Sequence, residues 1–127
     1  MRRLTWLTRN SAELLETHSN PGMRPWLIPR PVAEATRLLA DRIARLPRWR
    51  VAACVPDAGT IVATRRTRVF RFVDDVCLRI EPDGLGGSVA RGTSRSRVGR
   101  GDFGQNARNL LEIQRALAAS GLLAKAD

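Results

Sequence analysis

The spacing of apolar residues changes at Pro47, and this change constrains the fold of the chain more than any other feature. Before it, apolar residues recur every three or four positions from Val32 to Leu46, which predicts an amphipathic helix with Pro31 at its first turn. After it, apolar and polar residues alternate from Trp49 to Val55, which predicts a strand. With 127 residues, the chain fits one domain that contains both kinds of element.

More alternating segments follow. Thr60–Thr67 is expected to pair with the preceding strand as a hairpin across residues 56–59. Residues 70–80 predict another strand or two, interrupted at Asp74-Asp75, and residues 88–98 predict a strand whose small side chains lie close under a helix.

A last helix is predicted from about Asp102 to Ser120, with Asp102 as its cap or first-turn acid and Gly121 just past its end. Its expected inner stripe consists of Phe103, Ala107, Leu110, Ile113 and Leu117. Glu112 is expected to pair with Arg108 and Arg115 on the outer face.

These elements predict an α+β fold, a curved antiparallel sheet of about four to five strands with two main helices packed on one face. Residues 25–121 form the predicted single domain, which includes a short strand at Trp26–Ile28 and core positions for Trp26 and Trp49. Residues 1–24 are expected to form a basic arm with a short helix at Ser11–Glu16, and residues 122–127 a C-terminal tail.

Charge is the first feature with functional content, because 22 basic and 12 acidic residues leave a net charge of +10. This balance favours polyanionic partners: a protein complex, an anionic membrane surface, or nucleic acid bound without sequence preference. Two acid-free stretches supply the expected basic surface, which comprises Arg65, Arg66, Arg68, Arg71, Arg91, Arg95 and Arg100. Arg2, Arg3, Trp6 and Arg9 give the arm an attachment role.

No apolar stretch is long enough to span a bilayer, and the start of the chain lacks the apolar run of a secretory signal. We therefore expect a cytoplasmic protein that can also lie at the periphery of a membrane.

Catalytic, metal and cofactor signals are weak. His18 is the only histidine, and Cys54 and Cys77 are expected to be buried free thiols, so no metal site is predicted. The segment Gly99–Gly104 matches the G-x-G-x-x-G pattern, but no second parallel strand follows and Asp102 would oppose a pyrophosphate. We expect no cofactor.

Arg97 has two open interpretations. It could help Arg100 hold an anion at the start of the last helix, or it could pair with Asp74, Asp75 or Asp102 as a structural, buried ion pair. The two adjacent aspartates are expected to point to opposite faces of a strand.

The segment Phe72-Val73-Asp74-Asp75, followed by Ser94-Arg95-Ser96-Arg97-Val98-Gly99-Arg100-Gly101-Asp102-Phe103-Gly104-Gln105-Asn106, resembles the family called domain of unknown function 1499. The resemblance covers residues 20–119. It departs from the family where an Asn-Cys pair near the start is missing and where Asn109 replaces a common arginine. The resemblance implies no established activity; members of the family are bacterial and plastid proteins, many with export or membrane-anchoring segments.

The motif positions are either architectural or the lining of a pocket; they are Asp74, Asp75, Ser94, Ser96, Arg97, Gly99, Asp102, Gly104 and Asn106. No reaction follows from them. The sequence favours a non-enzymatic binding or accessory domain that acts through its basic surface. Its alternatives are a small-ligand protein or enzyme built on the motif, and a non-specific nucleic-acid binder.

Overall fold

The computed structural model describes residues 11–68, 72–97 and 104–124. In chain order the elements are β1 (Ser11–Glu13), η1 (Pro21–Met23), β2 (Trp26–Ile28), α2 (Val32–Ala44), β3 (Trp49–Val55), η2 (Pro56–Ala58), β4 (Thr60–Arg66), β5 (Val73–Pro82), β6 (Ser88–Ser96) and α3 (Gln105–Ala119).

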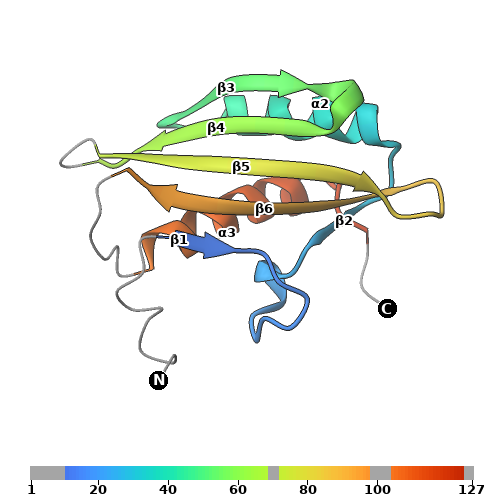
Figure 1. Cartoon of the computed structure of the whole chain (residues 1–127), viewed down its shortest axis with the longest axis horizontal. Helices are drawn as coiled ribbons and strands as arrows, with labels where there is room; N and C mark the ends of the chain where they lie inside the picture. Colours follow the sequence, from blue (N-terminus) through green and yellow to red (C-terminus); the bar gives the residue numbers. More distant parts are fainter. Residues whose placement is uncertain (1–10, 69–71, 98–103, 125–127) are drawn as a thin grey trace.

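The six strands form one antiparallel sheet in the order β1-β6-β5-β4-β3, and β2 also pairs with β6. Helices α2 and α3 both lie behind this sheet in Figure 1, so the face toward the viewer carries neither helix. The predicted α+β architecture with helices on one face is confirmed.

The two helices form where the spacing of apolar residues predicted them. In α2, Ala35, Leu39 and Ile43 are fully buried, and the helix ends before Pro47, which cannot continue it. In α3, the buried stripe includes Leu110, Ile113 and Leu117. Phe103 and Asp102 lie outside the described residues.

Period-2 alternation separates the two faces of the sheet. In β5, Val76, Leu78 and Ile80 are buried against the helices, whereas Cys77 and Arg79 are exposed on the other face. The predicted burial of Cys77 is therefore wrong, since its odd-numbered position points it away from the core. Cys54 is half-buried.

Strand β5 runs without a break through Asp74 and Asp75, so the predicted interruption is wrong. Each carboxylate has a hydrogen-bonding partner on its own face, from Asn109 for Asp74 and from Arg97 for Asp75. These bonds offset the poor strand propensity of aspartate.

The first described residues belong to the sheet and core. The helix predicted at Ser11–Glu16 is wrong, because Ser11–Glu13 pairs with β6 as a strand. Leu14 and Met23, both 2% exposed, pack in the core, although the sequence assigned residues 1–24 to the arm. Leu122, from the segment predicted as a tail, is also buried.

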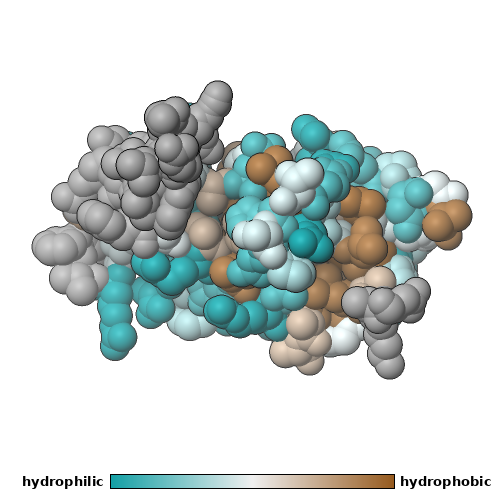
Figure 2. Space-filling model, turned by 90° about the horizontal axis from the view of Figure 1, so that it is seen from below, coloured by the Kyte–Doolittle hydropathy of each residue, from teal (hydrophilic) through white to brown (hydrophobic). Residues whose placement is uncertain are grey.

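The edge of the sheet that carries β1 and β2 is mostly hydrophilic in its described part, with hydrophobic residues gathered toward one end (Figure 2). Leu15 and Leu27, from the segments at this edge, are 45% and 54% exposed. Within the described ranges, no helix is both long and apolar enough to cross a membrane.

Candidate functional site

Four motif residues converge on the helix-covered face of the sheet. Asn109 of α3 donates through Nδ2 to Asp74 Oδ2 at 2.8 Å and to Ser94 Oγ at 3.2 Å. Ser94 donates through Oγ to Asn106 Oδ1 at 2.6 Å, and Asn106 donates through Nδ2 to Ser96 Oγ at 2.9 Å. Asp74, Ser94, Asn106 and Asn109 are at most 2% exposed. We call these four residues together with the half-buried Ser96 the polar cluster.

The polar cluster ties β5 and β6 to the first turns of α3. Hydrogen bonds join its members to one another, and Asn109 Oδ1 also accepts one from Gln105 Nε2 at 2.7 Å. Such bonding lets polar groups remain buried at low cost. Asn109, which the sequence treated only as a departure from the family pattern, is central to it. Because Asn109 follows Asn106 by three positions, the two share one helix face, and this spacing could have identified it. The geometry favours the architectural interpretation.

Asp75 and Arg97 lie on the opposite face of the sheet from the polar cluster. Arg97 donates through Nε and Nη2 to the two carboxylate oxygens of Asp75, each at 2.9 Å. The side chain of Arg97 is 58% exposed and that of Asp75 is 37% exposed. Asp75 was among the expected partners of Arg97, but the prediction that this ion pair is buried is wrong. The hydrogen bond to Asp75 raises the pKa of Arg97, and the attraction of the carboxylate adds to it.

Gly104 has a left-handed φ of 88° at the N-cap of α3, a conformation that favours glycine at this motif position. Gly99, Asp102 and the predicted helix-start anion site with Arg100 lie outside the described residues.

The predicted basic surface is divided by the fold. Arg66, Arg68 and Arg95 are exposed, and Arg91 is half-buried. Arg65 does not belong to this surface, since its odd-numbered position in β4 points it to the helix side, where its side chain is 12% exposed. The other predicted basic and arm residues lie outside the described part of the chain; they are Arg2, Arg3, Trp6, Arg9, Arg71 and Arg100.

Arg65 instead joins the sheet to α3. Glu112 Oε1 accepts hydrogen bonds from Arg65 Nε and from Trp49 Nε1, both at 2.9 Å. Glu112 turns toward the sheet and forms its ion pair with Arg65. The prediction that it pairs with Arg108 and Arg115 is therefore wrong.

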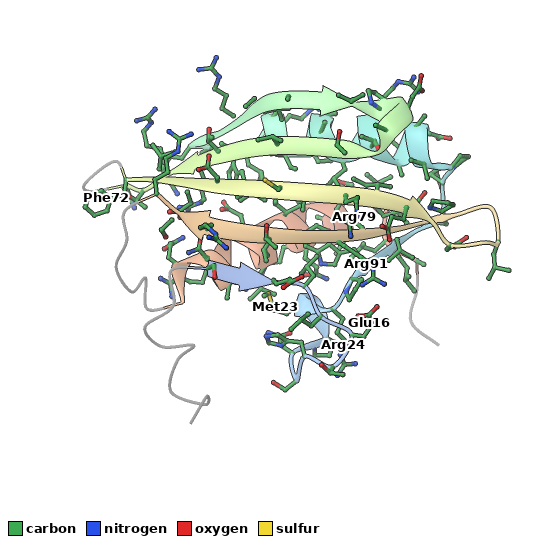
Figure 3. All side chains as sticks on the ribbon, in the orientation of Figure 1. Glu16, Met23, Arg24, Phe72, Arg79 and Arg91 are labelled. Carbon is green, nitrogen blue, oxygen red and sulfur yellow. The ribbon has the colours of Figure 1, made fainter. Side chains whose placement is uncertain are left out.

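The helix-free side of the sheet, which we call the open face, carries a chain of ion pairs. Arg79 and Arg91 lie directly opposite each other on β5 and β6, and both form ion pairs with Glu81. Arg91 also binds Glu16, which approaches it from the segment after β1 (Figure 3). The hydrogen bond from Arg91 lowers the pKa of Glu16, and that bond raises the pKa of Arg91. These pairs link the segment after β1 to the sheet.

Other arginines of the open face have no such partner among the described acids. Arg50, Arg66 and Arg95 lie on β3, β4 and β6, and none forms an ion pair with an acid of the described ranges. Between the charged residues, Val62 and Cys77 occupy neighbouring positions of β4 and β5, and Val62 is 37% exposed.

One end of the open face contains a hollow of about 240 Å³, lined by Arg48, Trp49, Arg50, Thr64, Arg66 and Val73. We call it the arginine hollow. The predicted basic surface included Arg66 but missed Arg48 and Arg50. Their alternation with Trp49 and Val51 was the signal that could have placed Arg50 on the open face.

In the described ranges, no three His, Cys, Asp or Glu side chains gather as metal ligands would. A model of the family described as "Protein of unknown function (DUF1499)" matches residues 7–117. No curated protein and no solved structure matches the chain.

Proposed function

The chain belongs to the DUF1499 family of proteins of unknown function, and we propose that it is a non-enzymatic binding domain that docks an acidic protein surface on its open face. The observation that carries this proposal is the arrangement of the sheet. Both helices cover one face, while the other presents arginines that no described acid neutralises.

Several features of the open face suit a protein partner. Arginine is enriched in protein interfaces because its planar guanidinium binds carboxylates through two parallel hydrogen bonds. Arg50, Arg66 and Arg95 are available for such bonds. Val62 and Cys77 provide small, partly apolar contact area between them. A surface that combines exposed cations with a modest apolar centre complements an acidic protein surface.

The acids of the same face favour a protein over a polyphosphate or a membrane. Asp75, Glu81 and Glu16 alternate with the arginines and would face the phosphates of a nucleic acid or an anionic bilayer. A protein partner can match both signs of charge, which gives specificity as well as attraction. The N-terminal residues Arg2, Arg3, Trp6 and Arg9 would add a second, weaker contact.

Site-specific photo-cross-linking in cells of the source organism tests this proposal. A photoreactive residue at Val62 reports on the open face, and one at the exposed Ala118 of α3 serves as the matched control on the helix side. We expect a discrete protein adduct from position 62 that position 118 does not give.

Charge reversal then tests how the captured partner binds. Once that protein is purified, Arg66→Glu combined with Arg95→Glu should abolish its binding to the full chain. Arg37→Glu combined with Arg115→Glu reverses two exposed charges on the helices and should leave binding nearly unchanged. Adducts with lipid or nucleic acid, the same adducts from both positions, or equal effects of the two charge reversals would contradict the proposal.

A further inference from the structure

We propose that the arginine hollow binds a phosphate monoester group. This inference rests on the proposed function, because the hollow lies at one end of the open face, and it names a chemical group that the partner would place there. The hollow is built from the start of β3, the end of β4 and the start of β5.

The backbone fixes the positions around the hollow. Arg50 and Thr64 are direct neighbours in the pairing of β3 with β4, and Arg66 is the neighbour of Val73 in the pairing of β4 with β5. The amide of Arg66 donates to the carbonyl of Arg48 at 2.9 Å. Three guanidinium groups and one hydroxyl therefore come from backbone segments held by the sheet.

The positive charge around the hollow is not balanced by acids of the described residues. Arg48, Arg50 and Arg66 form no ion pair with any acid in the described ranges. On the open face, the acid nearest to the hollow in the strand pairing is Asp75, opposite Thr64, and both of its carboxylate oxygens accept from Arg97. The hollow thus presents three cations that no acid of the described residues neutralises.

A phosphate monoester matches this arrangement better than a carboxylate does. It carries close to two negative charges near neutral pH and three strong acceptor oxygens, whereas a carboxylate carries one charge and two oxygens. Arginine binds phosphate oxygens through its planar fork of donors, and the Thr64 hydroxyl adds a neutral donor. The hollow, at about 240 Å³, also has room for the atoms that carry the phosphate.

Arg48 provides a second, independent observation. Its φ of 70° lies in the left-handed region, and it is the only such non-glycine residue in the described ranges. Glycine or asparagine adopts this conformation more readily, so arginine is an unfavourable choice for the turn alone. Such strained residues cluster at ligand sites, where the side chain is needed in place.

Titration of the isotopically labelled full chain, followed by amide chemical shifts, tests the inference. Inorganic phosphate and O-phosphoserine should give saturable shifts at residues 48–50 and 64–66, and acetate at equal concentrations should bind at least about tenfold more weakly. Shifts that do not saturate, or equal affinity for acetate, would overturn the proposal.

Two variants show whether the arginines act specifically. Arg50→Gln combined with Arg66→Gln should weaken phosphate binding by about a hundredfold, since each charge-assisted bond contributes about tenfold or more. Arg37→Gln combined with Arg115→Gln removes the same charge from the helices and should change the affinity by less than about twofold at moderate salt. An equal loss in the two variants would refute a built site.

Arg48→Gly separates binding from folding. It relieves the left-handed conformation, so the protein should melt no lower than the parent while phosphate binding weakens by about tenfold. Unchanged phosphate affinity in this variant would exclude Arg48 from the site.

The source of the phosphate is distinguished by two further probes. A phosphoserine peptide should bind with the same dependence on Arg50 and Arg66. Binding only to vesicles that contain phosphatidic acid, with none to phosphate or the peptide, would overturn the proposal.

The failure of this inference can be distinguished from the failure of the proposed function. If phosphate fails to bind while the Val62 adduct persists, only the phosphate site in the arginine hollow is refuted. If phosphate binds without a protein adduct, only the docking function fails.

Discussion

Asn109→Leu should destabilise the protein strongly, although it removes only polar atoms and preserves approximate side-chain size. Asn109 is fully buried and donates both to the Asp74 carboxylate and to Ser94 Oγ. The bond to a charged acceptor is worth about 1.5–3 kcal/mol and the neutral bond about 0.5–1.5 kcal/mol. We expect the free energy of unfolding to fall by about 2–4.5 kcal/mol, with a decrease in melting temperature of about 7–17 °C.

Removing the acceptor as well should restore part of this loss. Asp74, 2% exposed, keeps a buried carboxylate that has lost its Asn109 donor in the single variant. In the double variant Asp74→Leu with Asn109→Leu, no such carboxylate remains, and replacing both partners by apolar groups is less costly than removing one. The double variant should therefore be more stable than the sum of the single effects predicts, by about 1.5–3 kcal/mol.

Thermal and urea unfolding of the parent, the two single variants and the double variant give this coupling directly. Arg115→Leu, at an exposed position of the same helix, is the control and should change stability by no more than about 0.5 kcal/mol. Additive effects of the two substitutions would refute the reasoning, because they would show that the Asp74 carboxylate does not depend on Asn109.

Three further substitutions test other parts of the fold, each by thermal and urea unfolding. Leu14→Ala should cost about 2–5 kcal/mol, because Leu14 is 2% exposed in the core; a loss below about 1 kcal/mol would show that this segment is dispensable. Gly92→Ala should cost about 1–3 kcal/mol, since its new Cβ would overlap Leu78 Cδ2, and an unchanged stability would contradict the close packing. Arg97→Ala should leave the melting temperature nearly unchanged, because its pair with Asp75 is exposed; a large drop would restore a structural role.

The long elements could be predicted from the sequence because their apolar spacing is sustained. Val32–Ala44, Trp49–Val55 and Thr60–Arg66 all lie within the predicted segments. The short strand Ser11–Glu13 could not, since its residues suit a helix and only pairing with β6 makes it a strand. In this segment tertiary contacts override local propensity.

The candidate sites show the same division between local and long-range information. The motif located Asp74, Ser94 and Asn106, but their mutual hydrogen bonds depend on how α3 lies on the sheet. Glu112 illustrates the limit, because its partners Trp49 and Arg65 are 63 and 47 positions away in the sequence. Helical spacing alone pointed to near neighbours instead.

The strands at the edges of the sheet limit how copies of this protein can associate by pairing their strands. One side of β6 is occupied by two successive three-residue strands, β1 and β2, rather than by one long strand. At the other end of the sheet, β3 is interrupted by a bulge between Val51 and Ala53. Short and bulged edges are poor templates for strand addition, so the protein should resist fibrillar aggregation even at high concentration.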